Sequence, residues 1–283
     1  MGVVLLYPLE NFQVKARSAA AERGWGYEVT TTGCVNKLFV VLFGMPFELH
    51  PWAWSPDAPF RGYQGMDPLN EQVQCVFLGK DANFPTDEEL HARPQESSWL
   101  SQYLSHPNAF FQENQNIHHP FRHPEWNIPG HDGGKYHRRL ARLLEDAAVQ
   151  PSSISILELL RLPTIGNSGR CELFKKAVSG QMPPHNGQAA HLEFIDKLLC
   201  TPHKRVFVFR GFGGLWHSFS NDQQELIRIS APRLADLGEW FGLPRAVGAP
   251  KPDSIKAEVF VHTHFSDAIS NAEIGAIAEI IRG

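Results

Sequence analysis

Two clusters of polar residues stand where predicted strands end, and their side chains could act together on a bond. Residues 79–84 read GKDANF and follow the apolar run VQCVFL, while residues 262–266 read HTHFS and follow KAEVFV. The carboxyl ends of parallel strands share one edge of a sheet, so Asp81 and a histidine of the second cluster can converge there. An acid and an imidazole around one crevice are typical of a hydrolytic or lyase site.

The same residues also have plain structural interpretations. Gly, Asp and Asn are favoured in turns for local backbone reasons, so Asp81 also fits a simple turn. His262 and His264 could each be structural residues after a strand. A third loop follows SISILELL (153–160) and adds Glu158 near the end of that strand and Asn167 beyond it.

Strands and helices alternate along the second part of the chain. Strands are expected at 73–79, 153–160, 204–214 and 256–262, the third closing on glycines, and helices at 135–148, 191–199 and 222–237, the last broken at Pro232. Ser270 and Glu273 have the spacing of a capping box that starts a final helix. This alternation predicts an α/β fold, a three-layer α/β/α sandwich with a mostly parallel central sheet of about four strands.

The helix at 135–148 has an apolar face that includes Tyr136 and Leu140, and a basic face with Lys135, Arg138, Arg139 and Arg142. Such a basic face is usually solvated, and DNA contact is the alternative. Residues 73–283 form the predicted domain, and residues 1–72 are expected to be an N-terminal elaboration packed on it.

Composition narrows the class of protein. The 283 residues carry a net charge of −4 and 42% hydrophobic residues, which suits a globular protein. The longest apolar run, LFVVLFGM, is too short to span a membrane, and the VVLL near Met1 has no basic leader, so a cytoplasmic monomer without membrane contact is expected. The four scattered cysteines have the pattern of reduced thiols rather than of zinc or iron–sulfur ligands.

Two segments of the sequence have partial cofactor or metal motifs. GFGG at 211–214 lacks the full dinucleotide fingerprint. His118, His119 and His123 could bind zinc in a metal-dependent hydrolase, but they do not present one face as a helical HExxH does. We therefore expect neither a metal nor a cofactor.

The order of the motifs resembles the uracil-DNA glycosylase superfamily from about residue 73 to the C-terminus. GKDAN at 79–83 is similar to the family's G-Q-D-P-Y or G-I-N-P-G, and HFSDAIS at 264–270 to H-P-S-P-L-S or N-P-S-x-L-S. Between them, PFRHP at 120–124 and ELLRLPT at 158–164 resemble P-F-x-H-P and N-L-V-x-R-P-T of the mismatch-specific branch. The resemblance implies a monofunctional DNA glycosylase of base excision repair, whose partner is DNA containing a damaged or deaminated base.

The resemblance also implies roles for individual residues. Asp81 matches the carboxylate that activates water and stabilises the cationic sugar, and His264, preferred to His262 by loop register, matches the group that bonds the O2 atom of the departing base. The expected substrate-binding residues are Gly79, Lys80, Asn83, Phe84, Phe121, Glu158, Ser266 and Ser270.

Among these, Phe121 is the best match for the aromatic that stacks on the flipped base, with Phe84 as its rival, and Ser266 and Ser270 lie in the loop that holds the duplex. Asn83 stands where the main uracil enzymes have a methyl-excluding Tyr, and Glu158 where many members have a base-reading Asn. The expected substrates therefore include uracil, hypoxanthine and xanthine. A noncatalytic nucleic-acid-binding protein of the same fold is the main alternative, and the zinc hydrolase is a lesser one.

Overall fold

The computed structural model describes residues 4–8, 27–30, 37–42, 48–49, 61–83, 101, 134–165, 187–242 and 251–283. The chain divides into two compact units, Met1–Glu48 and Leu49–Gly283. Residues 61–72, which the sequence pattern assigns to the N-terminal elaboration, belong to the larger unit. The boundary between the units therefore falls before the expected position at residue 72.

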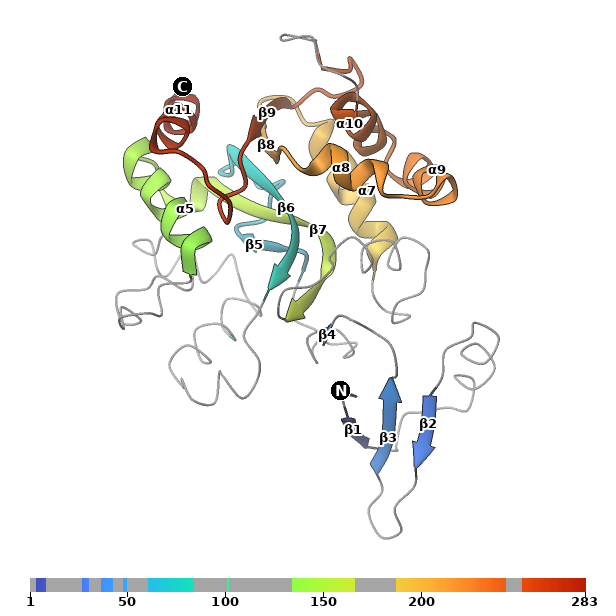
Figure 1. Cartoon of the computed structure of the whole chain (residues 1–283). Helices are drawn as coiled ribbons and strands as arrows, with labels where there is room; N and C mark the ends of the chain where they lie inside the picture. Colours follow the sequence, from blue (N-terminus) through green and yellow to red (C-terminus); the bar gives the residue numbers. More distant parts are fainter. Residues whose placement is uncertain are drawn as a thin grey trace. The chain divides into compact units, whose positions relative to one another are not determined.

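The smaller unit contains a three-stranded antiparallel sheet with the order β1-β3-β2 (Figure 1). The strands are β1 (Val4–Pro8), β2 (Tyr27–Thr30) and β3 (Lys37–Leu42). The apolar run LFVVL lies in β3, the central strand, where β-branched and aromatic residues are favoured. This run is therefore a sheet strand.

The larger unit is built on four parallel strands, which confirms the predicted α/β fold. They are β6 (Cys75–Asn83), β7 (Ile154–Ile165), β8 (Arg205–Phe209) and β9 (Glu258–His262), in the order β7-β6-β8-β9. Two short strands extend the sheet at β7: β4 (Glu48–Leu49) and β5 (Tyr63–Gly65), the latter antiparallel to β7.

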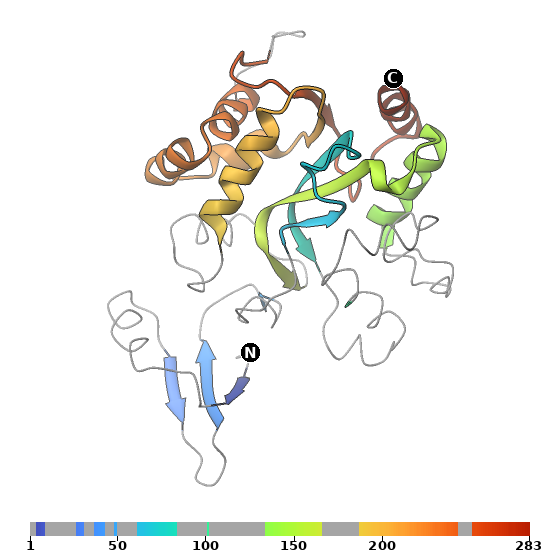
Figure 2. The same ribbon diagram turned by 180° about the vertical axis from the view of Figure 1, so that it is seen from behind.

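Helices cover both faces of this sheet and give the predicted three layers (Figures 1 and 2). One face is covered by α5 (Gly134–Ala147) and α11 (Asn271–Arg282), and the other by α7 (Gln188–Leu199), α8 (Phe212–His217), α9 (Asn221–Ser230) and α10 (Pro232–Gly242). A single turn of 3-10 helix, η5 (Pro151–Ser153), precedes β7. The core under α5 and α11 contains the predicted apolar face of α5, four apolar residues of α11 (Ile274, Ile277, Ala278 and Ile281), and Phe77, Ile156 and Phe207 of the sheet.

Two strands run further than the sequence pattern predicts. The expected ends were Gly79 for β6 and Leu160 for β7, but the strands continue to Asn83 and Ile165 because they pair with each other over this stretch. The register changes between the pairs Asp81–Leu160 and Asn83–Thr164, so β7 bulges around Pro163, a residue that cannot donate to a ladder. Glu158 therefore lies inside a strand rather than near its end.

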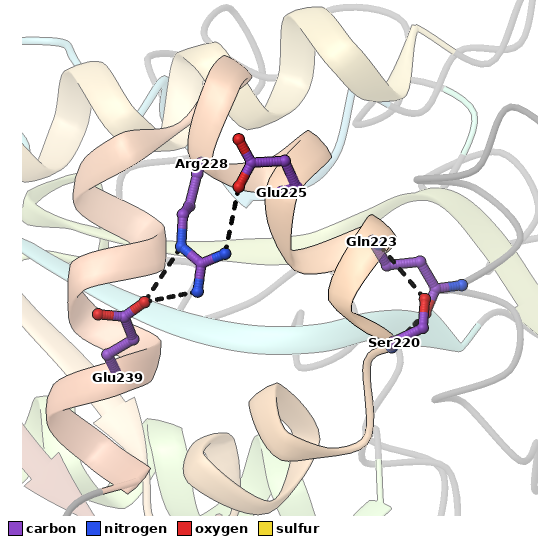
Figure 3. Close-up of polar contacts among 5 residues, drawn as sticks. All are labelled: Ser220, Gln223, Glu225, Arg228 and Glu239. Atoms are coloured by element: carbon purple, nitrogen blue, oxygen red, sulfur yellow. Dashed lines mark hydrogen bonds and ion pairs between the residues drawn. The ribbon is translucent and has the colours of Figure 1, made fainter.

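The helix expected at 222–237 divides as predicted at Pro232, which becomes the first residue of α10. The first of its two parts, α9, starts with a complete capping box between Ser220 and Gln223 (Figure 3). Arg228 then joins α9 to α10 through two hydrogen bonds to Glu239, at 2.8 and 3.1 Å, and also bonds Glu225. No helix in the described ranges is long and apolar enough to cross a membrane.

Candidate functional site

The strand order creates a switch point between β6 and β8. From β6 the chain passes to β7 on one side, and from β7 it returns to β8 on the other side of β6. In open α/β sheets, ligands bind in the crevice beyond the carboxyl ends of the strands at such a point. Gly79 and Lys80 lie within β6, level with the end of β8, whose last residue is Phe209.

Four residues form a row across the sheet at this edge, on the face covered by α5 and α11. Gly79 pairs with Glu158 of β7, and Phe209 pairs with His262 of β9. Each residue follows a core residue of the same face by two positions, as Gly79 follows Phe77, and side chains of a strand alternate between faces. Across the sheet, the row therefore consists of the Glu158 carboxylate, Gly79, the Phe209 ring and the His262 imidazole.

Gly79 makes room for the carboxylate of Glu158. A Cβ on residue 79 would lie 2.1 Å from Glu158 Oε2, well inside any real contact. Glu158 is only 5% exposed, and Gln64 Nε2 donates to its Oε1 at 3.4 Å. The sequence pattern predicts that Gly79 begins a turn. In the structure a glycine is needed here because the buried Glu158 carboxylate occupies the space of a side chain at residue 79.

His264 lies between two aromatic rings at the same edge. Its ring centroid is 5.3 Å from that of Tyr136 and 5.9 Å from that of Phe209, which it meets edge-on. The backbone N–H of Ser266 donates to His264 Nδ1 at 3.3 Å. Because Nδ1 accepts, the neutral ring carries its proton on Nε2, and that atom is a hydrogen-bond donor.

His262 has a different environment, in the core. It is 2% exposed, meets Phe77 edge-on, and its Nδ1 donates to the carbonyl of Thr263 at 2.8 Å. Burial lowers the pKa of His262, so the ring is neutral, and its Nε2 has no hydrogen-bond partner in the described parts of the chain. Of the two candidate imidazoles, His264 is the partly exposed one.

Lys80 and Tyr136 supply charge and a hydroxyl near His264. Lys80 Nζ lies 5.3 Å from the ring centroid of Phe209, the same ring that His264 contacts. Burial, followed by the negative charge of Glu158, raises the pKa of Tyr136, so its hydroxyl stays protonated at neutral pH. The Lys80 ammonium and the Tyr136 ring therefore lie close to His264 at this edge.

The remaining predicted residues are placed only in part. Asp81 and Asn83 are backbone positions of β6 opposite Leu160 and Thr164, and their side chains lie outside the described part of the structure. The same is true of every atom of Phe84, Phe121, His118, His119 and His123. Within the described ranges no group of three or more His, Cys, Asp or Glu side chains could hold a metal ion.

The loop after β9 contains the two predicted serines, both exposed. Ser270 caps α11 as predicted, accepting from the N–H of Glu273 at 3.1 Å. The predicted capping box is nevertheless incomplete, because the Glu273 carboxylate accepts from the N–H and the hydroxyl of Thr263, at 2.6 and 2.9 Å. Glu273 thus ties the loop to α11.

Three residues near His264 were not predicted as parts of the site: Tyr136, Phe209 and Arg139. Tyr136 and Phe209 were assigned to a helix stripe and a strand, and Arg139 to a solvated or DNA-binding face. In the structure Arg139 donates to the carbonyls of Phe265 and Asp267. The sequence signal for this part of the site is a tyrosine within an apolar helix face, followed three residues later by an arginine.

Comparisons with known proteins identify no relative of this chain. No family model matches it, and neither a curated protein nor a solved structure matches it significantly.

Proposed function

We propose that this chain is a DNA glycosylase that flips a deaminated base out of DNA and hydrolyses its N-glycosidic bond. The observation that carries the proposal is His264, whose accepting Nδ1 leaves Nε2 as a donor at the carboxyl edge of the sheet. That donor lies at the switch point where β6, the strand that contains Asp81, reaches the same edge. The order of motifs along the sequence gives the second line of support.

The proposed reaction needs one water and no cofactor. The Asp81 carboxylate accepts a proton as the water oxygen bonds to C1′ of the sugar, and its charge stabilises the oxocarbenium-like transition state. The C1′–N bond breaks, and its electron pair leaves with the base. His264 Nε2–H donates to O2 of a departing uracil, or to N3 of a departing purine, where negative charge develops, and the base anion then takes up a proton.

In this proposal the flipped base is held by an aromatic ring and selected by the Glu158 carboxylate. Phe121 or Phe84 stacks on the flipped base. Every base has a π-face that can stack on a phenyl ring, so polar groups must distinguish one base from another. Glu158 is nearly buried and accepts from Gln64, so its carboxylate can read N–H groups on a base edge but, when ionised, cannot donate to a carbonyl. This favours a range of deaminated bases, uracil, hypoxanthine and xanthine, over strict uracil selection.

The DNA backbone would be held by the loop after β9. Ser266 and Ser270 are exposed there, and Lys80 adds a positive charge in β6, beside the Phe209 ring of β8. The enzyme is proposed to act as a monomer in the cytoplasm.

A base-release panel tests the proposal. Oligonucleotides containing uracil, hypoxanthine, xanthine or a thymine mismatch are incubated with the protein and scored for abasic sites. We expect release of at least one deaminated base, reduced about a hundredfold or more by Asp81→Asn while DNA binding is retained. Asp253→Asn serves as the matched control, because this exposed acid precedes the amino end of β9, and the variant should keep the full rate.

The panel also separates the competing functions. Salt-dependent DNA binding by the wild-type protein without any base release would overturn the glycosylase and favour a noncatalytic nucleic-acid-binding protein. Stoichiometric zinc in the purified protein, with activity lost on its removal, would favour the hydrolase that uses His118, His119 and His123.

A further inference from the structure

The exposed loop that carries His264 forms hydrogen bonds within itself and to α5 and α11. Ser266, Asp267 and Ala268 are exposed, as expected of a surface loop. A β-turn forms within it, because the N–H of Asp267 donates to the carbonyl of His264 at 2.8 Å. The exposed part of the loop is therefore a defined turn that begins at His264.

The sheet and α11 hold the first part of this loop. Thr263 is bonded through its N–H and its hydroxyl to Glu273, and through its carbonyl to His262. Phe265 is fully buried, with its ring centroid 5.4 Å from that of Phe77. These contacts fix the backbone on both sides of His264.

Arg139 of α5 holds the second part. Its Nη1 donates to the carbonyls of Phe265 and Asp267, the residues on either side of Ser266. The N–H of Ser266 is the group that donates to His264 Nδ1. A charged donor shared between two carbonyls is a strong constraint on the peptide units around Ser266.

From these contacts we infer that Arg139 is a positioning residue that sets the tautomer of His264. By fixing the carbonyls of Phe265 and Asp267, it aims the Ser266 N–H at Nδ1 and so keeps the imidazole proton on Nε2. Arg142, one turn further along the helix, bonds Asn271 and Asp146 instead. Arg142 therefore provides a matched control on the same helix.

The first test reads the tautomer directly. Nitrogen-15 NMR of the His264 ring is compared among the wild type, Arg139→Gln, Arg139→Lys and Arg142→Gln, with hydrogen exchange of the Ser266 amide alongside. We expect Nδ1 to be unprotonated in the wild type and in Arg142→Gln. In Arg139→Gln we expect mixed tautomers and amide exchange faster by about tenfold or more, since opening of the turn loses a charged hydrogen-bond donor.

The conservative variant keeps the test decisive. Lysine retains the charge but lacks the planar guanidinium, so Arg139→Lys should give intermediate exchange and partial recovery of the Nε2–H tautomer. Urea titration shows whether each variant is folded. If Arg139→Gln is unfolded, the tautomer and amide exchange of Arg139→Lys test the inference instead. A folded Arg139 variant with the wild-type tautomer and wild-type exchange would overturn the inference.

The expected effect of Arg139 on catalysis rests on the proposed function, whereas its expected effect on the His264 tautomer does not. If the chain releases bases, Arg139→Gln should lower kcat about tenfold with little change in KM, because the donor is needed mainly in the transition state. Arg142→Gln should leave both constants unchanged. Absence of base release by the wild type would refute the proposed function alone, and the NMR result would still decide the role of Arg139.

Discussion

Gly79→Ala is expected to destabilise the protein because of one neighbour, the carboxylate of Glu158. The φ angle of Gly79 lies outside the left-handed region, so alanine meets no backbone strain, and the clash is the 2.1 Å approach of its Cβ to Glu158 Oε2. Moving a buried side chain to relieve such overpacking lowers the unfolding free energy by about 1–3 kcal/mol. Alanine has less backbone freedom than glycine in the unfolded chain, and this offsets about 0.5–1 kcal/mol of that loss. The net loss of unfolding free energy should be about 1–2 kcal/mol.

A double-mutant cycle assigns this loss to its cause. In a Glu158→Ala background the obstacle is absent, so Gly79→Ala should be neutral or stabilise by about 0.5 kcal/mol. Urea titrations followed by tryptophan fluorescence give the four unfolding free energies. Gly275→Ala in α11, where an added Cβ meets nothing within 4 Å, is the control and should stabilise. An equal loss from Gly79→Ala in both backgrounds would refute the role of Glu158.

Three further outcomes are expected. Lys204 is 6% exposed and its Nζ donates to two backbone carbonyls of the 70–73 turn, so Lys204→Met should lower the unfolding free energy by about 2–3 kcal/mol in urea; a loss below about 0.5 kcal/mol would contradict this. Burial lowers the pKa of His191 to about 4, so the unfolded state binds the extra proton first and stability falls as pH drops from about 6.5 toward 4, by about 3 kcal/mol in total; His191→Gln should flatten this slope, and an unchanged slope would contradict the burial of this imidazole. Ser220→Ala removes the cap of α9 and should lower the unfolding free energy by about 1 kcal/mol in thermal unfolding, whereas Ser220→Asp, which keeps an accepting oxygen at the N-cap, should show little loss.

The fold was accessible from the sequence because its signals are local. Apolar runs rich in Val, Ile and Phe identified the four parallel strands, and the stripe of α5 through Leu140 and Leu144 identified that helix. The strand ends were not accessible. Gly79 looks like a terminator, yet β6 continues because β7 pairs with it, and strand pairing between residues 80 positions apart has no local signal.

The candidate site was predicted in outline and not in its supporting contacts. The pattern placed His264 at the carboxyl edge, and the structure adds the accepting Nδ1 that makes it a donor. Arg139 was assigned to a basic face because helical periodicity shows which residues share a face but not what lies opposite. Its contact with the loop after β9 depends on tertiary packing of α5 beside α11.

The crystal structure of Asp81→Asn bound to a uracil-containing duplex tests the central claim most directly. The account predicts an extrahelical uracil beyond the carboxyl ends of β6 and β8, with its O2 accepting a hydrogen bond from His264 Nε2. A uracil that stays stacked in the duplex, or one bound away from this edge of the sheet, would contradict it.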